Sequence, residues 1–568
     1  MNRYSHQSPL AITLPKVPEL PTFAKDPLFG LLIFSAVLGG LMAATGGFGG
    51  RKPKLSKGRF ASKGEVKRAE KIAKKQIAEQ GLETALMIGK IALPYANESV
   101  AFAGAPGKGK TASVSNPALL NTIRRGLPFM CYDLKGGRAD SQTKIFAPIA
   151  AAHGYEVFVL APGQPYSDVM NLLDFVESPD DLVTANKIAE ILEANAKGSN
   201  NSRKDFFTMS GVAIVAAGIL TSKLSHFQDL LMVSRTINQP GLMDRLKLMR
   251  EDYNSNPWVV AAWDQLLSSE GADRQLAGMI ATAQGIFKRF MSPDLIPSFC
   301  GRSTIPKDLT GKKALFLQTD DGRRETVIPL LAVVIELMLS HNFSKGREDP
   351  LVFLGDEIPS IFLPNLVKNI NELRSAGLIA FLGYQNFAQL KNQFGPDLAE
   401  ALISACGTKF FFNPGSEATA KSFSAYVGNK DVHYHSTSRS YGKSRGRSRS
   451  EQVKEVPLVS PTEFLTFGKG QCVMLNPGYQ SKSGDKAALP VLMRIPLVKE
   501  DSALMKKGQK LWKSQLEKSL TERALSQLSI LDVELAVQER QEEADRIIPM
   551  PEYEDDEKDS KTTNEVAF

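Results

Sequence analysis

The sequence has few of the residues that build disulfide frameworks and metal clusters. Its 568 residues include four cysteines and six histidines, and no two cysteines have the Cys-x-x-Cys spacing of a metal or redox site. The cysteines are far apart, and each lies in or beside an apolar run: Cys131, Cys300, Cys406 and Cys472. We therefore expect reduced, packed thiols in a cytosolic domain.

Neither charge nor apolar content is extreme. Hydrophobic residues make up 43% of the chain and charged residues 23%, an ordinary globular composition. The length is enough for about two or three domains. A net charge of +8 permits an anionic partner such as nucleic acid or a membrane surface.

One uncharged run near the start, Leu28 to Gly46, is long enough to cross a bilayer, which takes about twenty residues. The segment 49–90 that follows is strongly basic, so the positive-inside rule places the remainder in the cytoplasm. We predict a non-cytoplasmic segment 1–27, one transmembrane helix at 28–48 and a large cytoplasmic part. A cleaved signal peptide and a buried helix are the alternatives. The basic segment suits anionic lipid or, alternatively, DNA.

Residues 104–111 read GAPGKGKT, a complete GxxxxGK[ST] phosphate loop between an apolar run and a stretch that can be helical. In this context glycines turn backbone N–H groups onto phosphates, Lys110 supplies a catalytic counter-charge and Thr111 a Mg²⁺ ligand. We predict binding of ATP with Mg²⁺; a glycine-rich turn with a solvated lysine is the alternative. The predicted nucleotide-binding residues are Gly104, Ala105, Pro106, Gly107, Lys108, Gly109, Lys110, Thr111 and Ala112.

Short apolar runs alternate with helical stretches along the cytoplasmic part. This alternation predicts an α/β fold, a mostly parallel sheet with helices on both faces. Strands are expected at 100–103, 129–132, 157–160, 314–317, 351–354, 378–382, 409–412 and 472–475. We divide the chain into a nucleotide-binding domain at 91–178 and 303–500, an inserted all-α domain at 179–302, a helical segment at 501–532 and a disordered acidic tail at 533–568.

Polar residues follow two of the predicted strands. Asp356 and Glu357 end the strand at 351–354, and Gln385 follows the strand at 378–382. Ligand-binding residues gather at the carboxyl edge of a parallel sheet. We predict that Asp356 holds the metal and Glu357 polarises the attacking water. Gln385 would contact the γ-phosphate, unless it is a surface amide.

The order of these elements resembles the TraG/TraD type IV coupling proteins, P-loop ATPases of the FtsK/HerA group with a RecA-like core. Two elements are the most specific: a DxKG sequence, Asp133, Lys135 and Gly136, and a Q-x3-Q-L sequence, Gln385, Gln389 and Leu390. The other matching sequences are NLLDF at 171–175, LVFLGDE at 351–357, RSAGLIAFLGYQNFAQL at 374–390 and TKFFFNP at 408–414.

The resemblance implies a homo-hexameric ring under the inner membrane that recruits DNA–relaxase or protein cargo to type IV secretion channel proteins. It also implies ATP hydrolysis coupled to transfer, with the all-α domain facing the cargo. The chain departs from the family in having one predicted membrane helix instead of two, Gly137 where many members have Glu, and Gly355 where many have an acidic or apolar residue.

In such a ring an arginine from a neighbouring subunit can stabilise transition-state charge. Arg374, Arg323 and Arg324 are candidates among which the sequence does not choose, and a surface salt bridge is the alternative for each. Residues 433–450 carry arginines, lysine, serines and tyrosines that suit DNA, or form a flexible loop between strands. The acidic tail docks a basic partner or only aids solubility.

Three functions fit these residues: a coupling ATPase for DNA transfer, a coupling ATPase for protein secretion, and an ATP-binding receptor without turnover. Glu357 favours the two ATPases, because binding alone needs no base. We favour DNA transfer. The chain shows no histidine-rich cluster and no constellation of nucleophilic tyrosines, so DNA cleavage would belong to a partner.

Overall fold

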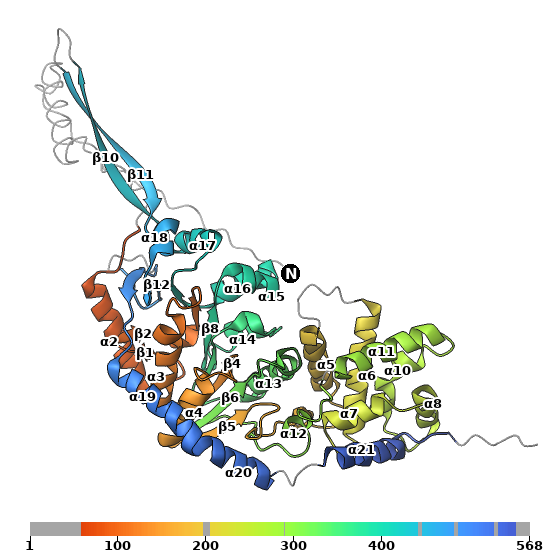
Figure 1. The fold of residues 1–568 in the computed structure, drawn as a ribbon. Helices are drawn as coiled ribbons and strands as arrows, with labels where there is room; N and C mark the ends of the chain where they lie inside the picture. The colour runs from red at the N-terminus through yellow and green to blue at the C-terminus, as the bar shows by residue number, and fades with distance from the viewer. Residues whose placement is uncertain are drawn as a thin grey trace, which may run out of the picture. The chain divides into compact units, whose positions relative to one another are not determined.

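A computed structural model of the chain describes residues 58–196, 205–288, 290–440, 446–481, 487–527 and 532–551. The predicted membrane helix at 28–48 and its flank 1–27 lie outside these residues. The chain divides into two units, one of residues 1–57 with 433–453 and one of residues 58–432 with 454–568 (Figure 1). The fold below is that of the second unit, except where the hairpin of the first is named.

The second unit is built on a nine-stranded sheet in the order β13-β12-β9-β3-β8-β7-β4-β6-β5. The strands from β9 to β5 are all parallel, and β12 pairs antiparallel with β9 and β13. This confirms the predicted α/β fold with a mostly parallel sheet. The strands are β3 Val100–Ala103, β4 Phe129–Asp133, β5 Glu156–Leu160, β6 Lys313–Gln318, β7 Leu351–Gly355, β8 Leu378–Tyr384, β9 Thr408–Phe411, β12 Gln471–Leu475 and β13 Val491–Arg494.

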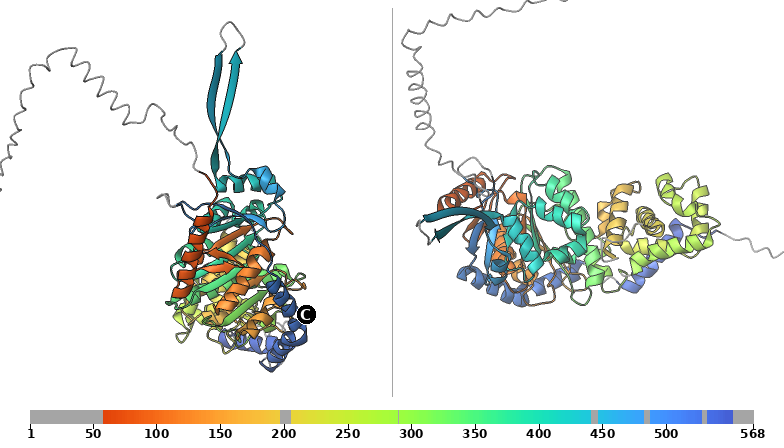
Figure 2. Two further views of the ribbon diagram at one scale, coloured as in Figure 1. Left: turned by 90° about the vertical axis from the view of Figure 1, so that its left-hand side faces the viewer. Right: turned by 90° about the horizontal axis from the view of Figure 1, so that it is seen from above.

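Every strand expected from the sequence is present in this sheet, and β13 is a further strand of the sheet that was not predicted. The central strands read as continuous apolar runs because helices cover both faces of the sheet (Figure 2). Alternate residues enter different cores: Met130 and Tyr132 of β4 pack into one cluster, Phe129 and Cys131 into the other. All four cysteines are buried free thiols, as predicted.

The helices on the two faces come from different parts of the chain. The core that holds Phe129 is covered by α2 Lys63–Glu79, α3 Asn116–Arg125, α4 Gln142–Ala152 and α19 Lys499–Leu511. The opposite core is covered by α13 Arg324–Ser344, α14 Leu366–Glu372, α15 Phe387–Phe394, α16 Pro396–Ala405 and α17 Glu417–Val427. In the described part of the chain α13 alone has the length and apolarity of a membrane span, and most of it is buried in the protein.

An all-helical block lies between β5 and β6 in the chain, in the region predicted to hold an inserted domain. Its central helix α6 is apolar around its circumference because α5, α7, α9 and α11 pack around it. The helices are α5 Leu182–Ala196, α6 Phe206–Ser222, α7 Leu230–Ile237, α8 Leu242–Glu251, α9 Pro257–Ala262, α10 Asp264–Leu267, α11 Asp273–Lys288 and α12 Ile296–Phe299.

The C-terminal segment is more ordered than predicted. After α19, a π-helical turn η6 (Trp512–Leu516) and α20 (Glu517–Gln527) continue the predicted helical segment. The prediction of a disordered tail from residue 533 is wrong for α21, Val533–Ile547, which packs on α7 of the helical block. The dense acidic residues that suggested disorder begin at residue 552, outside the described residues.

Within the described residues, two β-hairpins lie outside the nine-stranded sheet. Strands β1 Leu86–Ile88 and β2 Ile91–Leu93 pair with each other across the boundary predicted at 90/91, so that boundary divides a structural unit. Strands β10 Asn429–Ser440 and β11 Gly446–Pro457 form a separate two-stranded sheet. The loop alternative for residues 433–450 is therefore wrong for the two strands, which extend far into this region. Helix α18, Pro461–Thr466, follows β11.

Candidate nucleotide-binding site

The phosphate loop connects β3 to α3, as its sequence requires. Gly107 and Gly109 adopt positive φ angles of 76° and 101°, which glycine tolerates without strain. A side chain at Gly109 is also excluded sterically, because a Cβ there would lie 2.8 Å from the backbone nitrogen of Gly470. Residues Thr111–Ser115 form a π-helical turn before α3 begins. The loop is thus a rigid, close-packed turn at the start of a helix.

The sheet order brings the predicted polar residues to this loop. Strands β3, β8 and β7 are neighbours, so their carboxyl ends meet at one edge. The Thr111 hydroxyl donates a 2.7 Å hydrogen bond to Asp356 Oδ2, and the Lys110 ammonium lies 3.0 Å from Glu357 Oε2. Gln385 Nε2 donates to the same Glu357 oxygen at 3.1 Å. Five residues predicted from three distant segments therefore form one cluster.

The donor set of this cluster fits Mg²⁺. Asp356 Oδ1 is buried and, within the described part of the chain, has no hydrogen-bond partner. A buried carboxylate oxygen without a partner is costly unless a ligand such as a cation completes its shell. Carboxylate and hydroxyl oxygens are ligands that Mg²⁺ prefers, so Asp356 and Thr111 can hold the ion.

A cavity of about 610 Å³ opens beside the cluster and is large enough for a nucleotide. Its wall combines the phosphate loop with the ends of β4, β7 and β8 and with four cations besides Lys110, namely Lys135, Arg138, Arg324 and Lys469. The lining residues are Pro106, Gly107, Gly109, Lys110, Thr111, Ala112, Asp133, Leu134, Lys135, Arg138, Asp140, Gln142, Arg324, Asp356, Glu357, Gln385 and Lys469.

The DxKG element forms part of this wall and is held by its own hydrogen bonds. Asp133 Oδ2 accepts from the Ser141 hydroxyl at 2.5 Å and from the Thr143 backbone and hydroxyl at 2.8 Å each. Its other oxygen accepts from the Lys135 backbone at 3.0 Å. Asp133 therefore positions the loop that follows β4. A Cβ at Gly137 would meet nothing within 4 Å, so the departure there removes no packing.

The three arginines considered as candidates for a role in a neighbour's site have different surroundings. Arg324 lines this chain's own cavity and pairs with Asp321. Arg323 is held by Asp294 at 2.6 Å. The Arg374 side chain is 53% exposed and lies 3.6 Å from Glu98. Arg374 is the least constrained of the three.

Sequence reasoning missed Arg138 and Lys469 as lining residues. Arg138 follows the DxKG element directly and pairs with Asp321 across the cavity mouth at 3.1 Å, so it was within reach of a motif argument. Lys469 is more than 350 residues from the phosphate loop in sequence, and no motif marks it.

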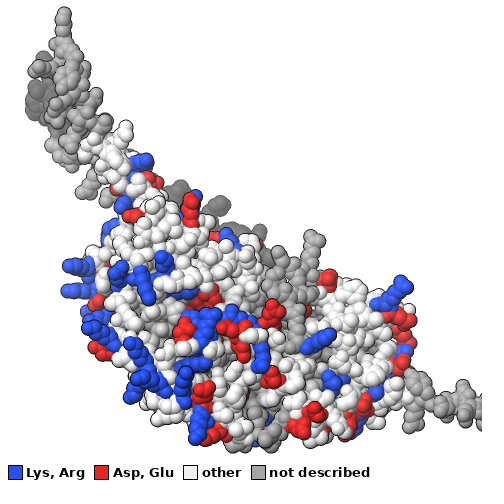
Figure 3. Space-filling model, viewed as in Figure 1, with Lys and Arg blue, Asp and Glu red and all other residues white. Residues whose placement is uncertain are grey.

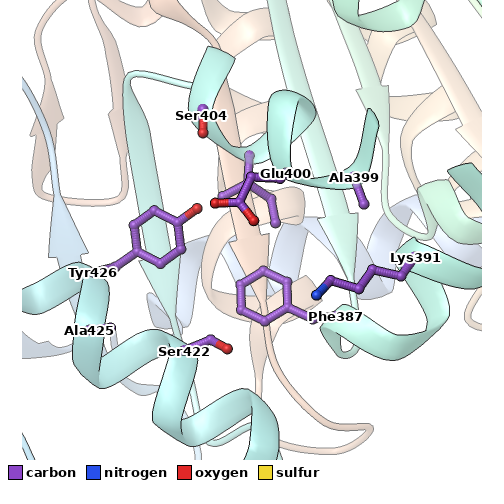
Figure 4. A pocket seen from close by; sticks show the side chains of 9 residues that line it. Phe387, Lys391, Ala399, Glu400, Ser404, Ser422, Ala425 and Tyr426 are labelled. Carbon is purple, nitrogen blue, oxygen red and sulfur yellow. The ribbon is translucent and has the colours of Figure 1, made fainter. Parts of the chain in front are cut away.

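A second cavity of about 410 Å³ lies between α15, α16 and α17. Figure 4 shows the Phe387 ring, the Glu400 carboxylate and the Tyr426 hydroxyl facing it. It has no glycine-rich turn, and it shares no lining residue with the cavity at the phosphate loop. Its mixed wall fits a small amphipathic group better than a triphosphate.

The fold and this site define a phosphate-loop protein of the α/β class. Residues 350–469 match a family model described as the TraM recognition site of TraD and TraG. Coupling protein TraD of Escherichia coli K12 is 25% identical over 29% of this chain and 24% of its own length. Conjugal transfer protein TraG of Rhizobium radiobacter is 24% identical over 67% of this chain and 60% of its own length. VirD4 of Bartonella quintana is 22% identical over 54% of this chain and 50% of its own length.

Among solved structures, the conjugative coupling protein TrwB has the same fold. An unbound form has a TM-score of 0.57 at 15% identity, covering 79% of this chain and 96% of that one. A TrwB complex with ADP and Mg²⁺ has a TM-score of 0.55 at 14% identity, with 79% and 97% covered. These comparisons confirm the resemblance to TraG/TraD coupling proteins. The matched part spans about a quarter to three fifths of the curated relatives' length.

Proposed function

We propose that this protein is a membrane-anchored ATPase that couples DNA–relaxase cargo to a type IV secretion channel. One observation carries the enzymatic part: the phosphate loop faces two adjacent carboxylates, with Lys110 at 3.0 Å from Glu357 and Thr111 at 2.7 Å from Asp356. TrwB, which has this fold, has been solved with ADP and Mg²⁺, and this supports the choice of ligand.

The residues divide the chemistry between them. Thr111 and Asp356 would hold Mg²⁺, which neutralises charge on the phosphates when bound. Lys110 exchanges its contact with Glu357 for a phosphate oxygen, and this frees the Glu357 carboxylate to polarise water. Gln385 holds the same carboxylate oxygen at 3.1 Å and would keep it oriented. Gln385 would thus still position the proposed base after Lys110 has turned to the phosphate.

Ring assembly would supply the remaining positive charge. Arg374 suits this role best, because its side chain is 53% exposed, more than those of Arg323 and Arg324. Its ion pair with Glu98, at 3.6 Å, is also longer than the 2.6 Å pair of Arg323 with Asp294. Mixing two inactive variants tests it. Lys110→Ala and Arg374→Ala subunits, each without turnover alone, should recover activity when mixed, because a Lys110→Ala subunit can donate Arg374 to its neighbour's intact site. Absence of recovery at any ratio contradicts a role in the neighbour's site.

Membrane anchoring and cargo are argued from charge. Helix α2, within the basic segment 49–90, carries exposed lysines 63, 67, 71, 74 and 75, and Figure 3 shows Lys and Arg gathered over the side of the second unit on which α2 lies. Lipid headgroups are the nearest anionic surface to such a helix. The basic hairpin of β10 and β11 would contact DNA, and the match of residues 350–469 to a TraM recognition site supports docking of a partner protein.

The test is an ATPase assay of the full-length chain in detergent, with and without single-stranded and duplex DNA. We expect turnover that DNA stimulates and that Lys110→Ala lowers by about 10²- to 10³-fold. Turnover that ignores DNA but responds to a cargo protein would favour protein secretion instead. Nucleotide binding without turnover under any condition would favour a receptor.

A further inference from the structure

A lysine far from the phosphate loop in sequence lies in the nucleotide cavity. Lys469 belongs to the loop between α18 and β12, and it is an exposed residue in the cavity wall. A Cβ placed on Gly109 would be 3.5 Å from Lys469 Cγ, so the lysine stem passes directly over the phosphate loop. From there the ammonium group is within reach of a phosphate held by the loop.

The loop that carries Lys469 is fixed to the phosphate loop by backbone hydrogen bonds. Gly470 donates its N–H to Lys108 O at 2.9 Å, and its own carbonyl accepts from Ile495 N at 2.9 Å. Asn413 adds a second link, because its carbonyl accepts from Ala105 N at 2.9 Å while its side chain donates to Phe467 O at 3.2 Å. The position of Lys469 is therefore set by the same framework that shapes the phosphate loop.

The charges around the cavity distinguish Lys469 from its neighbours. The other lining cations are each paired: Lys110 with Glu357, Lys135 with Asp140, and both Arg138 and Arg324 with Asp321. Across the described part of the chain, no hydrogen bond or ion pair engages the Lys469 ammonium. A lysine left without an anion in a cavity built for a polyanion is suited to bind that anion itself.

We propose that Lys469 is a second phosphate-binding lysine of the nucleotide site, contacting the triphosphate on the side of Gly109. This rests on the proposed function and adds a residue to it. Lys110 and Glu357 act where the γ-phosphate is split, whereas Lys469 would hold the nucleotide through its other phosphates. Its loss should therefore weaken binding of ADP and ATP alike and leave turnover at saturating ATP nearly unchanged.

The test compares Lys469→Gln, Lys469→Arg and the wild type as full-length chains, with fluorescent ATP and ADP analogues as probes and KM and kcat measured separately. We expect Lys469→Gln to raise Kd for both nucleotides and KM about tenfold, with kcat within about twofold, since charge-assisted hydrogen bonds are the strong ones. Lys469→Arg should retain most of the affinity. Lys421→Gln, which removes an exposed lysine that pairs with Glu417 on α17, is the matched control for net charge.

The outcomes separate this inference from the function on which it rests. A loss of affinity for ATP alone would overturn the placement of Lys469 beside the phosphates that ADP and ATP share. Unchanged affinity for both nucleotides would overturn the inference and leave the proposed function intact. So would an equal loss in Lys469→Arg and Lys469→Gln, because that would indicate a structural role for the loop. A wild-type chain that binds neither nucleotide would overturn both.

Discussion

Two of the ion pairs that join distant parts of the described chain differ in what surrounds them. Lys110 and Glu357 meet in the wall of a cavity, with side-chain exposures of 9% and 17%. Beside them lies Asp356 Oδ1, which has no hydrogen-bond partner among the residues that the structure describes. Arg540 and Asp229 are 4% and 1% exposed, and the guanidinium donates from Nε and Nη2 to the carboxylate. The first pair, which we call the open pair, is available to a ligand. The second, which we call the closed pair, is buried within the protein.

Both residues of the closed pair make further contacts. Asp229 also caps α7 by accepting from Met232 N at 3.0 Å, and Arg540 lies 4.5 Å from the centroid of the Phe227 ring. Burial opposes the charge on Arg540, but the hydrogen bonds and charge of Asp229 outweigh it and raise the pKa of the guanidinium. Pairing alone therefore does not mark a functional site. Here the distinguishing feature is a buried carboxylate oxygen, Asp356 Oδ1, that has no partner among the described residues and lies beside a cavity.

The largest expected effect breaks the closed pair. Arg540→Ala leaves a buried carboxylate without its partner, and such a change costs about 3–5 kcal/mol. We expect a lower midpoint of denaturant unfolding and earlier proteolytic cleavage after α20, because α21 loses its attachment to α7. The matched control is Arg546→Ala on the same helix, whose pair with Glu543 is largely exposed on the arginine side and is worth at most about 1 kcal/mol. Equal stability of the two variants would contradict the structural role of Arg540.

Lys110→Ala breaks the open pair and should lower turnover strongly while changing the stability of the fold little. Loss of one preorganised cation at a reacting phosphate costs about 10²- to 10³-fold in turnover. Stability should change little, because Glu357 borders a cavity and can be hydrated. ATPase activity and the unfolding midpoint, measured on the same preparation, check this. Marked destabilisation with residual turnover would reverse our assignment of the two pairs.

Asp356→Asn tests the carboxylate whose Oδ1 has no hydrogen-bond partner within the described residues. An amide in place of the carboxylate keeps the shape but removes the charge that attracts Mg²⁺. We expect the Mg²⁺ concentration for half-maximal hydrolysis to rise about tenfold, the equivalent of about 1.4 kcal/mol. EDTA should abolish turnover of the wild type. A Mg²⁺ dependence identical to that of the wild type would remove Asp356 from the proposed metal site.

The smallest expected effect is that of a substitution in α2 on the stability of the fold. Arg59 and the Ser62 backbone N–H hold the Glu65 carboxylate and lower its pKa to about 2. Because the folded pKa lies below the ordinary value of about 4.5, this contribution to stability is present at neutral pH and is lost as pH falls from about 4.5 toward 2. Glu65→Gln should therefore lower stability slightly at pH 7 and leave it unchanged near pH 2, as denaturant titrations at both values would show. A difference that persists at pH 2 would contradict this cause.

The polar residues at the carboxyl edge of the sheet could be predicted from the sequence, whereas the docking of the C-terminal helix α21 could not. The reason is physical. A parallel strand buried on both faces must be an apolar run, and residues after such runs share one edge, so Asp356, Glu357 and Gln385 were found near the phosphate loop without coordinates. Helix α21 docks through Arg540 and Asp229, which are 311 residues apart. Such a contact leaves no local pattern, and composition alone suggested disorder.

Lys469 was missed for the same reason. Its place in the cavity follows from backbone hydrogen bonds of Gly470 and Asn413 to the phosphate loop, and any residue type satisfies such bonds. The three candidate arginines could not be distinguished in sequence, because an ion-pair partner elsewhere in the chain leaves no local pattern. Only their partners in space, Glu98, Asp294 and Asp321, distinguish them.

The most direct test of the central claim, that Glu357 activates water at an ATP site formed with Lys110, is single-turnover hydrolysis by Glu357→Gln. The account predicts that ATP binds at least as tightly as to the wild type, because the amide no longer holds the Lys110 ammonium, while hydrolysis slows by about 10²- to 10⁴-fold. Hydrolysis at the wild-type rate in that variant would contradict the account.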